Sequence, residues 1–386
     1  MEQPTDRPHI LILFSDTGGG HRSAAEAIIE ALALEYGDAV TTEMLDFFKG
    51  YAPLPLNKMP DWYPDMVKAP HLWGLSFKIS DGRRRARAIT TSMWPYVGRA
   101  ARAIVKDHPA DLVLTVHALA TTVILKALGY NRPPFVTVVT DLVSTHALWY
   151  DQRADLILVP TEKARQRAIE YTMQPEKVRV VGQPVAARCC VPAGDKAALR
   201  KKLGWETDRT MVLLVGGGDG MGPLGKTARA IAASGLDLGL AIVTGRNQRL
   251  KEHLERLNWP VPAHIYGFTH EMPDFMRAAD VLVSKAGPGT IAEALNAGLP
   301  IVLYAKLPGQ EDGNVSFVVE ENLGVWAPSP AQVVEVLTQW VRNPRLREEY
   351  AANCRRAARP EAAREIARAI GEILELTPQE SLVLTD

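Results

Sequence analysis

The stretch Ser284-Lys285-Ala286-Gly287-Pro288-Gly289-Thr290-Ile291-Ala292-Glu293-Ala294 decides the fold of this chain. The apolar run Asp280 to Val283 before it predicts a buried strand, and Ile301 to Tyr304 after it predicts the next strand. Between these runs the glycines open a loop, and a helix is expected to begin near Pro288, whose fixed φ suits a first helical position. Strand, loop, helix and strand in this order are the repeating unit of a parallel α/β sheet.

The same stretch carries groups that suit a nucleotide sugar. A glycine loop that enters a helix presents backbone N–H groups and a positive helix end, which together bind a diphosphate. Glu293 lies four residues after Gly289 and can accept a hydrogen bond from a ribose hydroxyl of the same ligand. Gln310 and Glu311 in the next loop offer an amide and a carboxylate to sugar hydroxyls. We therefore expect a nucleotide-sugar site here.

The α/β unit recurs along the whole chain. The run His9 to Phe14 predicts a first strand, and Ser15-Asp16-Thr17-Gly18-Gly19-Gly20-His21 then leads into a helix that continues to about Leu34. A second series of units begins at Met211 to Val215, followed by the glycine loop Gly216 to Gly222. Further strands are expected at Val40–Leu45, Asp111–Val116, Phe135–Val139, Asp155–Val159, Val178–Val181, Leu238–Val243 and Ala263–Tyr266.

Two doubly wound, Rossmann-like domains follow from this pattern. A glycine- and proline-containing linker, Gly182 to Gly194, separates residues 1–187 from residues 188–386, and the second domain is expected to end in a helical tail that runs to about Leu376. Ligands of such sheets bind outside the carboxyl ends of the strands, where every glycine loop of this chain is predicted to lie. The two domains are therefore expected to face each other across a cleft.

Composition narrows the class of protein. The 386 residues carry 44 basic and 44 acidic side chains, so bulk charge does not suggest a nucleic-acid partner. The three cysteines fit neither a disulfide framework nor a metal site, which favours a reducing cytoplasmic compartment. No stretch reaches the roughly 20 apolar residues of a spanning helix. Any contact with a membrane is thus expected to be peripheral.

An irregular insertion is predicted between Phe47 and Arg87. Prolines alternate there with aromatic residues that include Trp62 and Trp73, and the basic cluster Arg83-Arg84-Arg85-Ala86-Arg87 closes it. Tryptophan suits a membrane interface, and each arginine gains about 1 kcal/mol from an anionic lipid surface. The alternative is an ordinary core or loop with a solvated run of charge.

Taken in order, the motifs resemble one family. They are similar to those of the plant-type monogalactosyldiacylglycerol synthases and the related processive diacylglycerol glucosyltransferases of bacteria, which are inverting enzymes of the GT-B fold and distant relatives of MurG. The resemblance extends from about Ile10 to Trp326. It rests on the loops already quoted, and on Val138-Val139-Thr140-Asp141-Leu142 with His146 and Trp149, Gly216-Gly217-Gly218-Asp219-Gly220-Met221-Gly222-Pro223, Gly267-Phe268-Thr269 and Gly309-Gln310-Glu311-Asp312-Gly313-Asn314.

The resemblance implies a role for each of these motifs. His21 would deprotonate the acceptor, with Asp141 as the second candidate base, and no metal ion or other cofactor is expected. Phe268 and Thr269 would border the uracil, Glu293 would bind the ribose, and Gln310 and Glu311 would bind the transferred hexose. The diphosphate would be held by the two glycine loops, and Lys285 would either screen its charge or be solvated. The remaining candidates are Gly217, Gly218, Gly220, Gly222, Ala286, Gly287, Gly289, Thr290 and Asn314 for the donor, and Gly19, Gly20, Trp62, Trp73, Arg83, Arg84, Arg85, His146 and Trp149 for the acceptor or an anionic membrane surface.

The implied activity is transfer of galactose from UDP-galactose to 1,2-diacylglycerol, with a β-glycosidic bond formed at the inner face of a membrane. The Ala286-Gly287-Pro288 form of the donor loop resembles the plant synthases more than the bacterial glucosyltransferases. UDP-glucose as donor is the nearest alternative. A UDP-sugar epimerase of the same fold, or a nucleotide-sugar-binding module without catalysis, are remoter ones.

Overall fold

The computed structural model describes residues 7–17, 19–66, 70–192, 194–220 and 222–379. The chain forms two compact units, one of Met1–Ala187 with Glu361–Asp386 and one of Arg188–Pro360. Each unit is built on a six-stranded sheet whose strands are all parallel. Gly18 and Met221, which belong to the two predicted glycine loops, lie outside the described residues.

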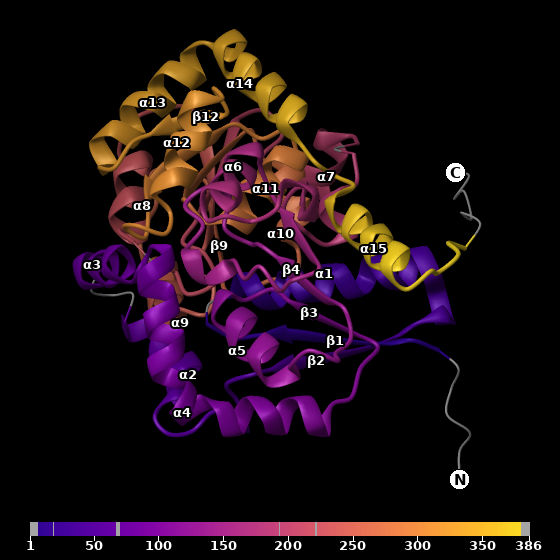
Figure 1. The fold of residues 1–386 in the computed structure, drawn as a ribbon. Helices are drawn as coiled ribbons and strands as arrows, with labels where there is room; N and C mark the ends of the chain where they lie inside the picture. The colour runs from indigo at the N-terminus through magenta and orange to yellow at the C-terminus, as the bar shows by residue number, and fades with distance from the viewer. Residues whose placement is uncertain (1–6, 18, 67–69, 193, 221, 380–386) are drawn as a thin grey trace. The chain divides into compact units, whose positions relative to one another are not determined.

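The sheet of the first unit has the strand order β2-β1-β3-β4-β5-β6 (Figure 1). Its central strands are continuous apolar runs because helices cover both of their faces. The order reverses beside β1, between β2 and β3, as in a doubly wound fold. The strands are β1 (His9–Phe14), β2 (Thr41–Asp46), β3 (Leu112–Thr115), β4 (Phe135–Val138), β5 (Leu156–Val159) and β6 (Val178–Val180), which confirms all six predicted strands to within a residue or two.

The segment that follows β2 is helical, so the prediction of an irregular insertion was wrong. Two of its prolines lie where a helix tolerates them, since Pro70 begins a helix and Pro60 is the second residue of another, whereas Pro64 is the sixth residue of that eight-residue helix. The basic cluster starts a 25-residue helix that contains Pro95. The helices are α2 (Met59–Met66), α3 (Pro70–Ser80) and α4 (Arg83–Asp107), and the sheet is further covered by α1 (Gly19–Tyr36), α5 (Ala118–Leu128) and α6 (Glu162–Glu170).

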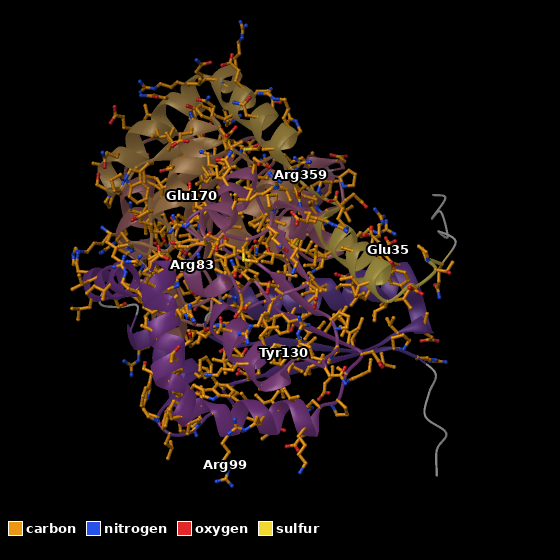
Figure 2. All side chains as sticks on the ribbon, viewed as in Figure 1. Glu35, Arg83, Arg99, Tyr130, Glu170 and Arg359 are labelled. Carbon is orange, nitrogen blue, oxygen red and sulfur yellow. The ribbon has the colours of Figure 1, made fainter. Side chains whose placement is uncertain are left out.

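The end of the chain belongs to the first unit, which corrects the assignment of the helical tail to the second domain. Helix α15 (Ala362–Ile373) packs on α1, and its Ile366 and Ile370 are fully buried in the core beneath β1. The buried carboxylate of Glu35 (labelled in Figure 2) pairs at this contact with Arg364 at 2.6 Å and accepts from Nε and Nη2 of Arg368. The apolar stripe of α15 matches this surface. The order of elements along the sequence does not show that the last helix packs on the first unit.

The second unit repeats the same architecture with the strand order β12-β11-β10-β7-β8-β9. Its strands are β7 (Thr210–Val215), β8 (Leu238–Val243), β9 (Ala263–Tyr266), β10 (Val281–Lys285), β11 (Ile301–Ala305) and β12 (Gly324–Trp326); the three-residue β12 was not predicted. Its helices are α7 (Lys196–Leu203), α8 (Leu224–Ala232), α9 (Gln248–Glu255), α10 (Met272–Ala278), α11 (Pro288–Asn296), α12 (Asp312–Glu320), α13 (Pro330–Arg342) and α14 (Pro344–Ala357). Of all described helices, none has both the length and the apolar composition that crossing a bilayer requires.

Candidate active site

His21 lies in the first turn of α1, just beyond the carboxyl end of β1. Its Nδ1 is 2.8 Å from the carbonyl oxygen of Val116, which follows β3. Because a carbonyl can only accept, Nδ1 must carry the ring hydrogen, and Nε2 then holds the lone pair. The hydroxyl oxygen of Thr140 lies 3.1 Å from the same Nδ1 and supports this orientation. The structure thus presents Nε2 of His21 as a hydrogen-bond acceptor and potential base.

The ring of His21 is neutral at physiological pH. Burial lowers the pKa of His21 to about 4, although its hydrogen bond to Val116 acts in the opposite direction. A general base has to be unprotonated before it can accept a proton, and this pKa meets that requirement at pH 7. Aromatic rings flank the imidazole, with His117 at 4.5 Å and Trp149 at 6.3 Å between ring centroids.

His117 forms a second, deeper layer at the same strand ends. Its Nδ1 accepts a hydrogen bond from the backbone N–H of Leu119 and so caps α5. Nε2 of His117 consequently carries the hydrogen and donates to the hydroxyl of Thr17 at 3.0 Å. Burial holds the pKa of His117 well below its usual value. His117 is therefore a neutral ring in a fixed tautomer, and it packs against the ring of His21.

Asp141, the second candidate base, is buried and bonded to the indole of Trp149. The indole Nε1–H donates to Asp141 Oδ2 at 2.8 Å, and the Trp149 ring packs near His21. This contact ties Asp141 to the Trp149 ring near His21, and a role of Asp141 as the base stays a prediction. Asp16, at the end of β1, is paired with Arg22 and Lys49, and the hydrogen bond from Arg22 lowers the pKa of Asp16 to about 2.

His146 and Trp149, predicted either to border the acceptor or to contribute to a membrane surface, are both buried. Trp149 is fully buried, and the buried ring of His146 accepts from the backbone N–H of Leu148 and contacts the Ser80 hydroxyl. Both side chains therefore belong to the interior of the first unit. By contrast, Trp62 and the arginines Arg83 to Arg85 are exposed, and the space around Gly19 and Gly20 is open.

The glycine loop of the second unit follows β7. Gly217, Gly220 and Gly222 have positive φ values, which side chains rarely adopt. At Gly220 a Cβ would also lie 2.4 Å from the carbonyl oxygen of Thr244, so the backbone passes too close for any other residue. These constraints shape a backbone-lined loop between β7 and α8, as the sequence predicts.

Lys285 and Glu311 form a buried ion pair beside this loop. Lys285 Nζ lies 2.5 Å from Glu311 Oε1, and Glu311 Oε2 accepts from the backbone N–H of Leu307 at 2.7 Å. A Cβ at Gly217 would meet the Lys285 side chain at 2.9 Å, so this cation lies directly against the glycine loop. The pair shows that Lys285 is held in place rather than solvated, and its screening of the diphosphate charge stays a prediction. A role for Glu311 and for its neighbour Gln310 in binding the hexose stays a prediction.

Helix α11 begins at the second loop, with Gly287 as its N-cap and Pro288 as its first residue. Asn314 of α12 donates to the carbonyl oxygen of Ala286 at 2.8 Å and fixes the approach to the helix. Gly289 and Thr290 lie in its first turn. Glu293 follows one turn later, and burial raises the pKa of its carboxyl to about 7.

The loop after β9 carries Phe268, which is exposed, and Thr269, whose hydroxyl accepts from the N–H of Glu271.

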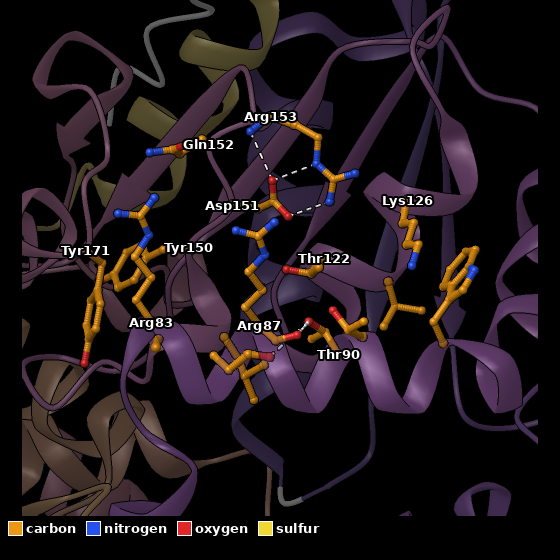
Figure 3. Close-up of a pocket in the computed structure, with 16 residues that line it drawn as sticks. Arg83, Arg87, Thr90, Thr122, Lys126, Tyr150, Asp151, Gln152, Arg153 and Tyr171 are labelled. Carbon is orange, nitrogen blue, oxygen red and sulfur yellow. Dashed lines mark hydrogen bonds and ion pairs between the residues drawn. The ribbon is translucent and has the colours of Figure 1, made fainter.

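The first unit contains a cationic cavity of about 410 Å³ that the sequence did not predict. Arg83 and Arg87 extend from α4 toward the segment that carries Asp151 and Arg153, and Lys126 of α5 completes the basic lining (Figure 3). Arg153 is already paired with Asp151. Of the residues that line this cavity, the sequence pointed only to the arginine cluster at the start of α4. Within the part of the chain that the structure describes, no group of three His, Cys, Asp or Glu side chains could hold a metal ion.

Comparison with known proteins agrees with this arrangement. The family model described as "Monogalactosyldiacylglycerol (MGDG) synthase" matches residues 21–185, and "Glycosyltransferase family 28 C-terminal domain" matches residues 211–367. A probable monogalactosyldiacylglycerol synthase 2 of Oryza sativa subsp. japonica is 37% identical over 379 residues, covering 95% of this chain and 80% of the relative. The chain belongs to the monogalactosyldiacylglycerol synthase family. Monogalactosyldiacylglycerol synthase 2 of Arabidopsis thaliana is 36% identical, covering 95% of this chain and 81% of that synthase.

Solved structures show that this synthase-family chain has the GT-B fold. MurG of Acinetobacter baumannii is similar with a TM-score of 0.61 and 16% identity, over 95% of this chain and all of that one. MnaA of S. aureus, solved with UDP, has a TM-score of 0.61 and 15% identity, over 96% of this chain and 97% of that one. At these identities the likeness concerns the fold alone.

Proposed function

We propose that this member of the monogalactosyldiacylglycerol synthase family transfers galactose from UDP-galactose to the free hydroxyl of 1,2-diacylglycerol. The observation that carries the proposal is the orientation of His21, whose Nδ1 is bound to the Val116 carbonyl and whose Nε2 is left with a lone pair. The names of the relatives supply the substrates, because the synthases of rice and Arabidopsis are named for the galactolipid that they make.

The chemistry of the transfer assigns a base to the first unit and a donor site to the second. Nε2 of His21 takes the proton of the glycerol hydroxyl while the hydroxyl oxygen bonds to the anomeric carbon of the sugar. The bond from that carbon to the diphosphate breaks on the opposite face, so the α-linked donor gives a β-linked product. Such a transition state resembles an oxocarbenium ion, as in glycoside hydrolysis.

We assign the departing diphosphate to the backbone groups of the second unit. The N-terminus of α11 and the loop before α8 both offer N–H donors, and the side chain of Lys285, whose ammonium pairs with Glu311, lies against Gly217. Preorganised donors of this kind stabilise negative charge where it develops. The proposed reaction therefore needs no metal ion for charge neutralisation.

Galactose is preferred to glucose on two grounds. The relatives are named as galactolipid synthases, and the Ala286-Gly287-Pro288 form of the donor loop resembles the plant synthases more than the bacterial glucosyltransferases. Epimerase chemistry has less support, because a structural neighbour described as a UDP-N-acetylglucosamine 2-epimerase is only 14% identical. UDP-glucose remains the alternative donor that an assay must include.

A peripheral position on an anionic membrane completes the proposal. Helix α3 exposes Leu72, Leu75 and Ile79, which are 69%, 56% and 60% exposed and lie along one face of the helix at spacings of three and four residues. The exposed arginines that begin α4 follow directly. Leucine and isoleucine beside arginine favour a lipid surface, from which a diacylglycerol acceptor can be taken.

A donor-choice assay tests the proposed function. Purified protein is incubated with diacylglycerol vesicles containing an anionic lipid and with UDP-galactose or UDP-glucose, and products are identified by mass and sugar stereochemistry. We expect β-monogalactosyldiacylglycerol and release of UDP. If glucosyldiacylglycerol alone forms, the donor is UDP-glucose instead of UDP-galactose. If the free nucleotide sugar is converted without a lipid product, the protein is an epimerase and not a transferase.

A further inference from the structure

An apolar cavity of about 280 Å³ lies in the first unit, between α4, the N-terminal half of α5 and the segment after β2. Its lining is almost entirely aliphatic and aromatic, apart from the Thr90 side chain. Pockets of this kind bind apolar ligands, because a dry apolar lining offers no polar partner. Six of its lining residues are Phe48, Met93, Val97, Leu119, Ala120 and Val123.

The side chain of His117 lies between this cavity and His21. The rings of Phe47 and Phe48, which line it, lie 5.1 Å and 6.1 Å from the His117 ring, and that ring is 4.5 Å from His21. Leu119 follows His117 in the first turn of α5 and also lines the cavity. The His117 ring thus separates His21 from the cavity, and a chain whose hydroxyl lies at His21 has to pass this ring to enter it.

We propose that this cavity binds one fatty acyl chain of the lipid acceptor. The inference rests on the proposed function, since it assumes that the hydroxyl at His21 belongs to a diacylglycerol. In that molecule the first atoms of the acyl ester are only a few bonds from the reacting hydroxyl. A chain held between Phe48 and Val97 anchors the glycerol beside the base and makes the cavity a determinant of acyl-chain preference.

An acyl chain of an anionic membrane lipid is the other candidate occupant of the apolar cavity. The apolar cavity shares Thr90, Val123 and Leu148 with the cationic cavity, so a lipid with its head group there could reach it from the opposite side. Ring contacts link the apolar cavity to His21, whereas none of the residues that line the cationic cavity has a ring contact with His21 or His117 among the described residues. The geometry therefore favours the acceptor.

Filling the cavity from α4 tests the proposal by acyl-chain preference. Ala100 lines the cavity and is half-buried, so Ala100→Phe places a ring inside it, while Ala88→Phe on the exposed face of the same helix is the matched control. We expect Ala100→Phe to lower kcat/KM for dipalmitoylglycerol relative to dioctanoylglycerol, by about fourfold for each methylene that the ring displaces. The control should keep the ratio of the wild type. An unchanged ratio in a folded Ala100→Phe protein would overturn the proposal.

Photo-crosslinking tests the location without relying on turnover. Wild-type protein is irradiated with diacylglycerol that carries a diazirine near the middle of one chain, or with phosphatidylglycerol labelled in the same way, and labelled peptides are mapped. We expect the diacylglycerol probe to label residues 89–104 and 119–124. Labelling there by phosphatidylglycerol alone, or at other sites by a protein that makes glycolipid, would overturn the acyl-site inference and leave the proposed function standing. Absence of any glycolipid product would instead overturn the proposed function.

Discussion

Nδ1 of His21 and the carbonyl oxygen of Val116 are 2.8 Å apart, joining residues that are 95 positions apart in the chain. The partner is a neutral carbonyl that orients the ring, and its hydrogen bond raises the pKa of His21 by less than burial lowers it. Burial then dominates and lowers that pKa to about 4. Strand β3 thus fixes the tautomer of a neutral imidazole, and this relationship governs the first two predictions.

His21→Ala should remove the proposed base and leave the fold and donor binding intact. General-base catalysis contributes typically 10²- to 10⁴-fold, and we expect kcat to fall by about that factor. UDP binding, measured by calorimetry, should match the wild type because the donor loops lie in the second unit. His9→Gln, which alters a histidine at the start of β1, is the control and should retain activity. Turnover within a few-fold of wild type would remove His21 as the base.

Activity should persist to unusually low pH. A histidine with an unperturbed pKa near 6.5 would lose its basic form below that pH, whereas the pKa of His21 is lowered to about 4. The acid limb of kcat/KM, which reports groups of the free enzyme, is therefore expected well below pH 6.5. The measurement uses short-chain acceptor in micelles across pH 4 to 8, with thermal melts at each pH to separate unfolding from titration. An acid limb at 6.5 would contradict the burial of this base.

The same burial makes stability depend on pH with a defined sign. The pKa values of His21 and His117 are lowered in the folded state, so the unfolded chain binds more protons below its own pKa of about 6.5. The free energy of unfolding should consequently fall as pH decreases from about 6.5 toward 4. Urea titrations of the wild type and of His117→Asn, which retains a side-chain acceptor for the N-terminus of α5, should show a shallower slope in the variant. Equal slopes would exclude His117 as a contributor.

The sequence predicted the strands and loops because their signals are local. Apolar runs located β1, β4, β8 and β9 to within a residue, and the positive φ of Gly220 follows from its loop. Placing His21 near the end of β3 required only the rule that carboxyl ends of parallel strands share one edge. The pairing of Lys285 with Glu311 depends on a register between loops that no local pattern encodes.

Tertiary packing accounts for what the sequence did not show. Proline-rich composition masked α2 and α3, although Pro60 and Pro70 occupy tolerated positions at the starts of these helices. The return of α15 to the first unit depends on the fit of its buried face to α1 and on the ion pairs of Glu35. The sequence left open whether His146 and Trp149 border the acceptor or a membrane surface, because burial of a polar ring becomes visible only with its partners, Leu148 and Asp141.

Lys285→Met should destabilise the second unit as well as weaken donor binding. Lys285 and Glu311 side chains are 17% and 4% exposed, so the substitution leaves the Glu311 carboxylate buried without its cation. Removing one partner of a buried pair costs roughly 3 kcal/mol, which denaturant titration can measure. Adding Glu311→Gln should recover most of that stability, because the amide still accepts from Leu307. The double variant should remain poor at binding UDP, and full recovery of UDP affinity would remove Lys285 from the donor site.

Membrane binding should depend on the apolar face of α3 and on the arginines that follow it. Replacing Leu72, Leu75 and Ile79 by serine removes exposed apolar side chains, and replacing Arg83, Arg84, Arg85 and Arg87 by glutamine removes about 1 kcal/mol of attraction to anionic lipid for each charge. Sedimentation with vesicles of 30% phosphatidylglycerol should fall in both variants. Added salt should weaken the remaining sedimentation of the serine variant, which keeps its arginines, but not that of the glutamine variant. Leu34→Ser, an exposed leucine of α1, serves as the control. Undiminished sedimentation of both variants would show that the charge run is a solvated face and that another surface meets the lipid.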